Sequence, residues 1–197
     1  MTFSTWILSL LMFVAPPERL AALPSYPGWA ETAAERTGRM QSIADDIAAV
    51  VADVDEQPIV GGHQGRARTA ALLVAIGSLE SGYAPDADKG PCWRGLDGKS
   101  TRCDGGLAVS AWQIRVGAGR TAEGYSREDL FADRKKAIRT ALHLVRRSVN
   151  ACRREAPLHR LAAFASGSCS RGHQASAARV QLAQHLLAAL PPPKDLP

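Results

Sequence analysis

The sequence has no apolar run long enough to cross a bilayer. Its longest run, Trp6 to Ala15, has about half the length that a membrane-spanning helix needs. Hydrophobic residues make up 46% of the 197 residues and charged residues 22%, which are the proportions of an ordinary globular protein. These values exclude a polytopic membrane protein, a collagen-like fibre and a chain too polar to bury a core. We expect one domain that folds in water and no stable membrane span.

Metal-binding motifs are also lacking. The four cysteines form no C-x-x-C pair, and the five histidines are scattered without the spacing of metal ligands. The sequence therefore predicts no metal site and no cofactor.

Lysine is scarce, since 19 of the 24 basic residues are arginine, and the formal net charge is +5. This excess suits an anionic partner such as nucleic acid, a membrane surface or a cell-wall polymer. The segment after Ser126 gathers basic residues on one helical face: Lys135, Lys136, Arg139, His143, Arg146, Arg147, Arg153 and Arg154. Neither interleaved aromatic residues nor a nucleic-acid-binding fold accompanies them, so we expect no nucleic acid partner. A solvated face and an attraction to envelope polymers remain as alternatives.

The N-terminal residues 1–25 allow two interpretations. Trp6 to Ala15 has the length of the hydrophobic part of a signal peptide, but no Lys or Arg precedes it and no clear cleavage site follows before Ala21 and Ala22. The alternative is a helix docked on the core. A single domain is expected over residues 26–190, followed by a proline-rich tail, 191–197.

The cysteines favour two disulfides. Sequence-near partners close loops at the lowest entropic cost, which favours Cys92 with Cys103 and Cys152 with Cys169. Disulfides persist in oxidising compartments, so a periplasmic or secreted protein is expected. The alternative is four buried thiols in a cytosolic protein.

Apolar spacing predicts helices and almost no regular strand. Gly82 stands where a left-handed helix cap is wanted, and residues 84–125 are glycine-rich with short β-like pieces. The expected helices are Trp29–Val54, Arg66–Ser81, a long one from Ser126 to about Arg154, a short one from Pro157, and Gln174–Leu190. The predicted fold class is mainly α (α+β), a helical bundle around a buried central helix with a small β/loop lobe.

Glu80 lies at the end of the most apolar of these helices. A helical wheel puts it in one arc with Leu72, Leu73, Ile76 and Leu79. Burial disfavours a charged carboxylate and the negative end of the helix dipole acts in the same direction, so Glu80 is a candidate general acid. The alternative is a glutamate that turns into solvent at a frayed helix end.

Four segments follow one another over about residues 66 to 185. They are LLVAIGSLESGYAPDAD, which contains Glu80-Ser81-Gly82-Tyr83; GLAVSAWQI, ending at Ile114; DLFADRKKAIRTALHLV, from Asp129; and LAAFASGSC, from Leu161. Together they resemble the lysozyme-like superfamily, in the branch of soluble lytic transglycosylases and goose-type lysozymes. The resemblance implies a lysozyme-like fold and cleavage of the glycan strands of peptidoglycan, by a protein expected to be a monomer.

The resemblance also implies a site. Glu80 matches the catalytic glutamate, and the residues around the glycan groove would be Ser81, Tyr83, Trp112, Gln113 and Phe164. A transglycosylase of this kind uses a single acid/base, with the substrate's N-acetyl group assisting and a 1,6-anhydro product formed without water. Trp112 or Trp93 would offer an apolar face to a sugar ring, although Trp112 is equally well explained as a core residue, and Ile114 is expected in the core.

Two rival functions stay open. Glycosidases usually need two carboxylates, and a hydrolytic goose-type enzyme would take its second from the lobe, where Asp86, Asp88, Asp97 and Asp104 lie without a distinguishing spacing. Phe164-Ala165 also replaces the family's Tyr-Asn pair, and a phenylalanine cannot donate the tyrosine's hydrogen bond. Tyr83 or Tyr125 would have to supply that hydroxyl, or else the chain is an inactive module that binds the cell envelope.

Overall fold

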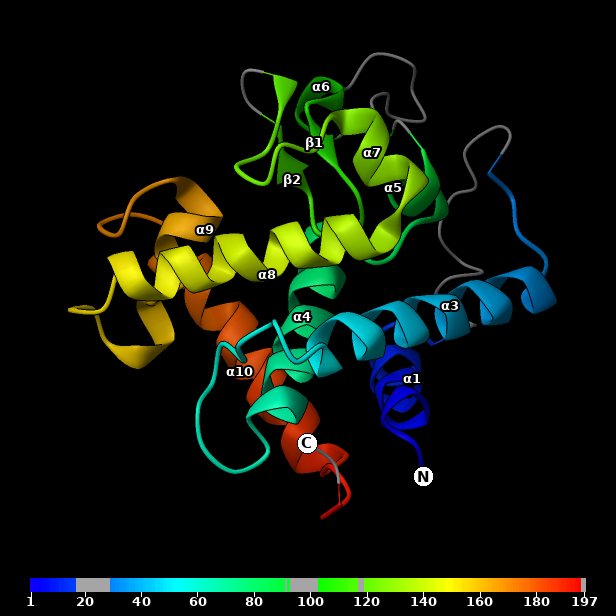
Figure 1. Ribbon diagram of the computed structural model, residues 1–197, viewed down its shortest axis with the longest axis horizontal. Helices are drawn as coiled ribbons and strands as arrows, with labels where there is room; N and C mark the ends of the chain where they lie inside the picture. The colour runs from blue at the N-terminus through cyan, green and yellow to red at the C-terminus, as the bar shows by residue number, and fades with distance from the viewer. Residues whose placement is uncertain (17–28, 91, 93–102, 117–118, 196–197) are drawn as a thin grey trace.

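The computed structural model is built mainly of helices, with one small sheet (Figure 1). It describes residues 1–16, 29–90, 92, 103–116 and 119–195. The predicted mainly-α class is therefore confirmed. The elements are α1 (Phe3–Val14), α3 (Ala33–Ala52), α4 (Gly65–Ser81), α5 (Pro85–Lys89), α6 (Cys103–Gly106), β1 (Ala108–Val109), β2 (Ile114–Arg115), α7 (Arg127–Ala132), α8 (Arg134–Ala151), the 3₁₀ helix η2 (Pro157–His159), α9 (Ala162–Ser166) and α10 (His173–Ala189).

Helix α4 forms the centre of the molecule. Every residue from Thr69 to Gly77 is buried, and α4 packs against α1, α3, α8 and α10 (Figure 1). A helix can be covered on all sides only if it carries no charge there, and no charged residue occurs between Thr69 and Leu79. The helix ends at Gly82, whose φ of 61° is the left-handed conformation expected of that glycine. This cap defines where α4 ends, directly after the turn that contains Glu80.

The apolar N-terminal run forms α1, which packs against α3 and α4. Trp6 is buried, and its indole Nε1 donates a hydrogen bond to the carbonyl oxygen of Leu190 at 3.0 Å. The C-terminal segment is held in a similar way, because the carbonyl oxygens of Pro192 and Pro193 accept hydrogen bonds from the side-chain amide of Gln64. Among the described residues, no helix is long and apolar enough to cross a membrane.

The prediction of one long helix after Ser126 is wrong, because the chain forms two helices there. Ser126 and Asp129 make a capping box that begins α7, and Asp133 then adopts extended backbone angles (φ −136°, ψ 102°). The side chain of Asp133 accepts from the amide of Lys135 and so begins α8 as a second cap. Since α8 ends at Ala151, Arg153 and Arg154 lie outside it.

Helix α3 begins later than expected, at Ala33. Thr32 and Glu35 form a capping box that fixes this start. Trp29 lies outside the helix, with its ring against Gly90: a Cβ at Gly90 would come 2.3 Å from the ring.

The lobe after α4 contains the one small sheet, strands β1 and β2 paired antiparallel with Val109 opposite Ile114. A tight connection between them has Ser110 and Gln113 at positive φ (68° and 50°). Both predicted disulfides are confirmed: Cys92 is bonded to Cys103 in the lobe, and Cys152 to Cys169 beyond α8.

Candidate functional site

A pocket of about 690 Å³ lies between the end of α4, strand β2, α8 and α9. Three of the residues expected at a glycan groove line it together, although they come from separate parts of the chain: Glu80, Gln113 and Phe164. The charged residues Asp104, Arg115 and Arg147 line it as well. The structure therefore brings the candidate catalytic carboxylate to the wall of a cavity.

Glu80 is held by an arginine that is far from it in sequence and was not among the expected site residues. Arg179, on α10, donates from Nε and Nη2 to the same carboxylate oxygen, Oε1, at 3.1 and 2.5 Å. The exposed fractions of the two side chains are only 11% for Arg179 and 19% for Glu80. The positive guanidinium therefore lies directly against the carboxylate, a contact that neither the burial of Glu80 nor the helix dipole implied.

The apolar arc predicted for α4 is wrong for Leu79, which was expected to be buried with the other leucines. Leu79 is 45% exposed, whereas Leu73 and Ile76 are fully buried. In the same turn Ser78, Glu80 and Ser81 are partly buried. Glu80 lines the pocket and is in contact with Arg179.

Ser81 and Tyr83 shape the turn that follows Glu80. The Ser81 hydroxyl donates to the carbonyl of Gly77 and accepts from the amide of Tyr83. The Tyr83 side chain is fully buried, and its hydroxyl donates to the carbonyl of Val74 at 3.0 Å. Burial, with a smaller contribution from the charge of Asp88, raises the pKa of Tyr83 well above its ordinary value. That hydroxyl does not line the pocket.

Trp112 belongs to the core. It has no exposed surface, and its Nε1 donates to the carbonyl of Leu73 at 3.0 Å. Its neighbour Gln113 lines the pocket, where the side-chain amide donates to the carbonyl of Ser110. Trp93 and Asp97 lie outside the described residues.

Phe164 supplies an apolar part of the pocket wall. The amide of Phe164 donates to the hydroxyl of Ser148 on α8, and that hydroxyl donates to the carbonyl of Arg160. The serine thereby ties α9 to α8 at the pocket. Tyr125 is not among the lining residues, so no tyrosine of the described part of the chain takes the place that Phe164 leaves without a hydroxyl.

The structure distinguishes the lobe carboxylates that the sequence could not separate. Asp88 is buried, and Arg134 donates to both of its carboxylate oxygens at 2.8 and 2.9 Å. Asp86 is buried too and does not line the pocket. Asp104 is exposed and lines the same pocket as Glu80.

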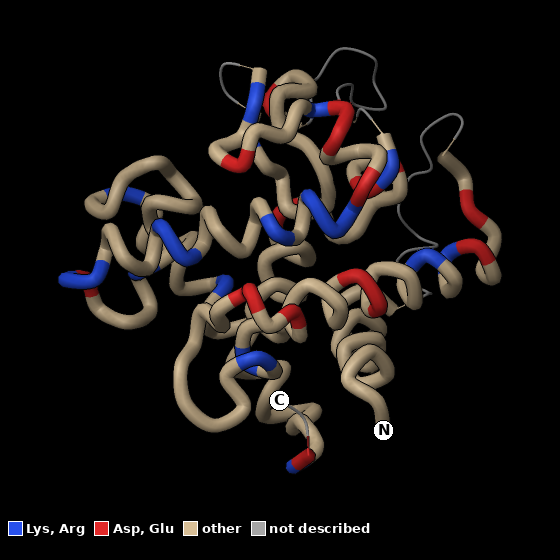
Figure 2. Tube along the Cα trace, in the orientation of Figure 1, with Lys and Arg blue, Asp and Glu red and all other residues tan. Residues whose placement is uncertain are grey.

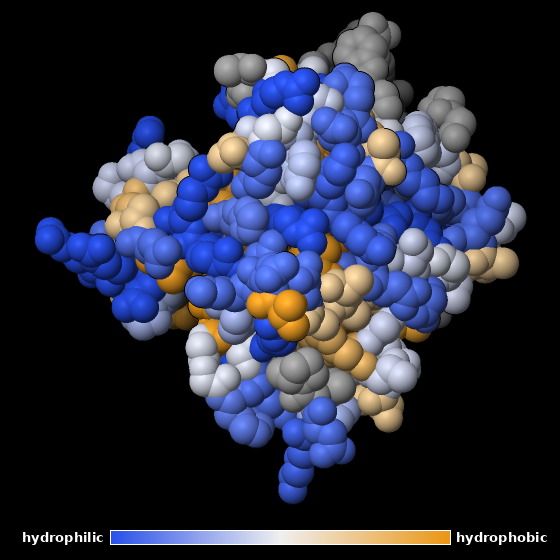
Figure 3. Space-filling model, viewed as in Figure 1, coloured by the Kyte–Doolittle hydropathy of each residue, from blue (hydrophilic) through white to orange (hydrophobic). Residues whose placement is uncertain are grey.

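The basic face expected on α8 is neutralised only in part, since four of its eight residues pair with acidic side chains. Acidic residues lie along the neighbouring α3 and the turn after it, and Figure 2 shows these charges beside those of α8. Glu56 pairs with Arg139, His143 and Arg146, while Asp129 pairs with Lys136. The side of the molecule seen in Figure 1 is hydrophilic over most of its area (Figure 3). Among the described residues, Arg147 has no acidic partner at ion-pair distance, and it lines the pocket.

Arg179 could be found only in part from sequence. Arg179 shares a buried helical face with Ser176, Ala183 and Leu186, and a lone arginine on such a face indicates a buried partner. Which carboxylate it meets depends on how α10 packs on α4. None of the pocket residues belongs to a group of possible metal ligands within the described chain.

Comparison of the sequence with protein-family models, with curated proteins and with solved structures finds no match.

Proposed function

We propose that this protein cleaves the glycan strands of peptidoglycan, with Glu80 as the acid/base, in the manner of a lytic transglycosylase. The observation that supports this most is the meeting of Glu80, Gln113 and Phe164 on one pocket of about 690 Å³. Clefts of this size hold small ligands or segments of a polymer. A carboxylate, an amide and an aromatic ring are suited to a glycosidic oxygen, an N-acetyl group and a sugar face.

Arg179 divides the roles of the two oxygens of Glu80. Because both guanidinium bonds end on Oε1, the proton for the leaving glycosidic oxygen would be carried by Oε2. A neutral carboxylic acid can keep Oε1 as the carbonyl acceptor of Arg179 while its Oε2 hydroxyl donates. After bond cleavage, the returning carboxylate is stabilised by Arg179 and can accept the proton of the attacking sugar hydroxyl.

The charge around the pocket favours a substrate that carries carboxylates. Arg115 on β2 and Arg147 on α8 both line the pocket, and neither pairs with an acidic residue of the described chain. Arginine binds carboxylates through paired hydrogen bonds. The peptide-bearing sugars of peptidoglycan supply such groups. The two disulfides fit the same setting, a protein that works outside the cytoplasm.

A hydrolase is the second candidate, and the position of Asp104 favours it. Asp104 and Glu80 line one pocket, so a water molecule activated by Asp104 would replace the intramolecular attack. The two reactions differ in their products, because hydrolysis yields reducing ends and transglycosylation yields 1,6-anhydro ends.

Digestion of purified peptidoglycan followed by mass analysis of the fragments tests both candidates. We expect anhydro-muropeptides from the wild-type protein and a loss of about 10² to 10⁴-fold in rate for Glu80→Gln, the usual contribution of general acid catalysis. Asp104→Asn should leave the rate of anhydro product unchanged if the single-carboxylate reaction is correct. If the wild-type products carry reducing ends and these disappear in Asp104→Asn, the protein is a hydrolase instead. If folded wild-type protein releases no fragments, the remaining candidate is a module that binds the envelope without cleaving it.

A further inference from the structure

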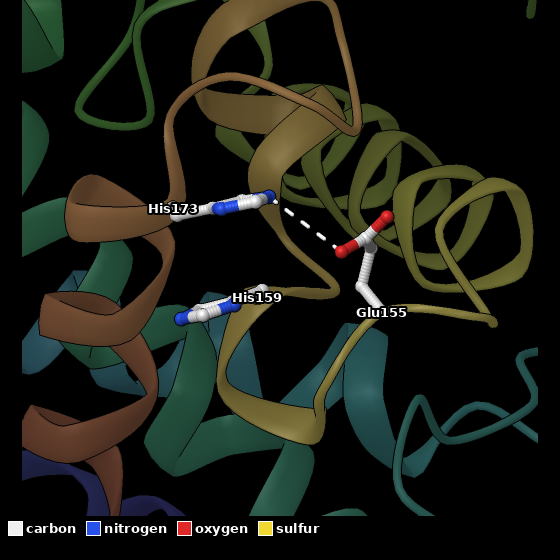
Figure 4. Close-up of side chains that lie close together, drawn as sticks. All are labelled: Glu155, His159 and His173. Atoms are coloured by element: carbon white, nitrogen blue, oxygen red, sulfur yellow. Dashed lines mark ion pairs between the residues drawn. The ribbon is translucent and has the colours of Figure 1, made fainter.

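Three potential metal ligands meet outside the pocket, on the segments that precede and follow α9. Glu155 lies in the chain after α8, His159 in η2, and His173 at the start of α10 (Figure 4). Each offers one ligand atom, and these atoms lie within 4.8 Å of one another. In Figure 4 the carboxylate of Glu155 faces the edge of the His173 ring, with the His159 ring beneath it.

The backbone around these side chains is fixed in advance. The Cys152–Cys169 disulfide joins the segment that leads to Glu155 to the segment that leads to His173. The Ser176 hydroxyl donates to the carbonyl of Leu158 and accepts from the amide of Leu161, which fastens α10 to η2 beside His159. A covalent bond and a pair of hydrogen bonds therefore hold the three segments together before any ligand arrives.

The only other histidine set among carboxylates in the described chain is unsuited to a cation. The ring nitrogens of His143 face Glu123 and Glu56, but Glu56 also receives Arg139 and Arg146. At the three-residue cluster, Glu155 pairs with His173 at 3.7 Å, and no guanidinium lies at ion-pair distance from its carboxylate. Arg160 donates from Nε to the backbone oxygen of Glu155 rather than to its carboxylate.

We propose that Glu155, His159 and His173 form a binding site for a divalent transition metal of the zinc class. Two imidazoles and one carboxylate are a donor set that zinc accepts, with a fourth position left for water or a carbonyl oxygen. The carbonyl of Cys169 accepts a hydrogen bond from His173 Nε2 at 2.7 Å, so this nitrogen would exchange its proton for the ion, and the carbonyl oxygen beside it could then take the fourth position. The bound ion would connect the segments on either side of α9 and so stiffen the wall of the pocket that carries Phe164.

Metal binding requires one ring to turn. The His159 and His173 rings stack with centroids 4.4 Å apart and planes at 5°. A nitrogen lone pair lies in the plane of its ring, so two parallel rings cannot both direct lone pairs at one ion about 2.0 Å away. Both side chains are partly exposed, which leaves room for the rotation. Loss of the stacked arrangement is therefore part of the binding event.

Calorimetric titration of tag-free, chelator-treated protein with zinc chloride tests the site. We expect one equivalent of zinc per chain, a raised melting temperature because the ion binds only the folded state, and a fall in affinity of at least about tenfold for His173→Ala and Glu155→Gln. His63→Ala is the matched control, since His63 is exposed and lies outside the cluster. It should bind zinc as the wild-type protein does.

Cobalt provides a second readout that a loosely attached surface ion does not give. Cobalt(II) bound by two imidazoles and a carboxylate should show the visible absorption bands of an ion with a low coordination number. His159→Ala should abolish these bands. Absence of zinc binding by the folded wild-type protein would overturn the proposal. So would equal affinities in His173→Ala, Glu155→Gln and the wild-type protein, with circular dichroism showing that each variant is folded.

Discussion

Arg179 donates two hydrogen bonds to a single oxygen of Glu80, and its third nitrogen, Nη1, donates to the carbonyl of Ala175 one turn earlier on α10. The arginine is therefore oriented by its own helix before it meets the carboxylate on α4. This contact joins the two helices at the edge of the pocket. It fixes the carboxylate rotamer, which leaves Oε2 as the oxygen available to a ligand.

The stability of this pair can be measured by a double-mutant cycle. Glu80→Gln and Arg179→Gln should each lower the free energy of unfolding at neutral pH, because each leaves a mostly buried charge without its partner. The double variant should lose less than the sum of the two, with a coupling of about 1 to 3 kcal/mol, the range for hydrogen bonds to charged groups. Urea denaturation measures all four proteins. Losses that simply add would mean that the contact contributes nothing to folding.

Much of the fold follows from local sequence signals. The uncharged run up to Leu79 and the glycine at position 82 are sufficient to predict a buried helix and its end. The two disulfides follow from short loop closure. In contrast, the sequence does not mark Asp133 as a helix cap, because the basic, apolar-periodic pattern continues on both sides of it. A capping side chain can interrupt a helix without any break in hydrophobic period.

The site could be predicted from the sequence only in part, because some of its contacts depend on how distant helices pack. Gln113 and Phe164 were expected near Glu80, and all three line one pocket. Trp112 has the same sequence neighbourhood as Gln113, yet its ring points into the core, because the strand connection turns through positive φ at Gln113. Ion pairs such as Arg179 with Glu80 depend on tertiary packing between helices. No local pattern contains that information.

Gly77 is required by the ring of Tyr83. A Cβ at this position would lie 2.6 Å from the Tyr83 hydroxyl oxygen, and Tyr83 is fully buried. Gly77→Ala should therefore destabilise the protein by about 1 to 3 kcal/mol through overpacking, despite the better helix propensity of alanine. Gly38→Ala, in α3, is the matched control, because nothing lies within 4 Å of its added Cβ. It should be neutral or stabilising by up to about 1 kcal/mol in thermal unfolding. Equal effects of the two substitutions would contradict the steric explanation.

Glu123 should make folding sensitive to acid. Burial alone would raise the pKa of its carboxyl, but hydrogen bonds from Thr121, from its own backbone amide and from His143 hold it below its ordinary value. A lowered folded-state pKa means that the stabilisation is present above the unfolded-state value and is lost as pH falls through the folded-state value. Glu123→Gln should thus be less stable than wild type near neutrality, and the difference should shrink between about pH 5 and about pH 3.

The control for that experiment is Asp55→Asn, an exposed acidic residue on the loop after α3. Its difference from wild type should stay small across the same pH range. Denaturant titrations at each pH supply the free energies of unfolding. A Glu123→Gln difference that is independent of pH would show that the carboxyl does not titrate differently on folding.

Arg115 and Arg147 should govern binding of carboxylate-bearing glycan at the pocket itself. Removing their charges, as Arg115→Gln with Arg147→Gln, should weaken retention on insoluble peptidoglycan, most strongly at about 50 mM salt, where charges are least screened. Arg153→Gln with Arg154→Gln removes the same charge from exposed positions beyond α8 that do not line the pocket. If the pocket arginines contact the substrate, the first pair should also raise KM for peptidoglycan fragments, while the second pair changes only weak retention at low salt. Equal effects of the two pairs at every salt concentration would mean that net charge, and not the pocket, determines binding.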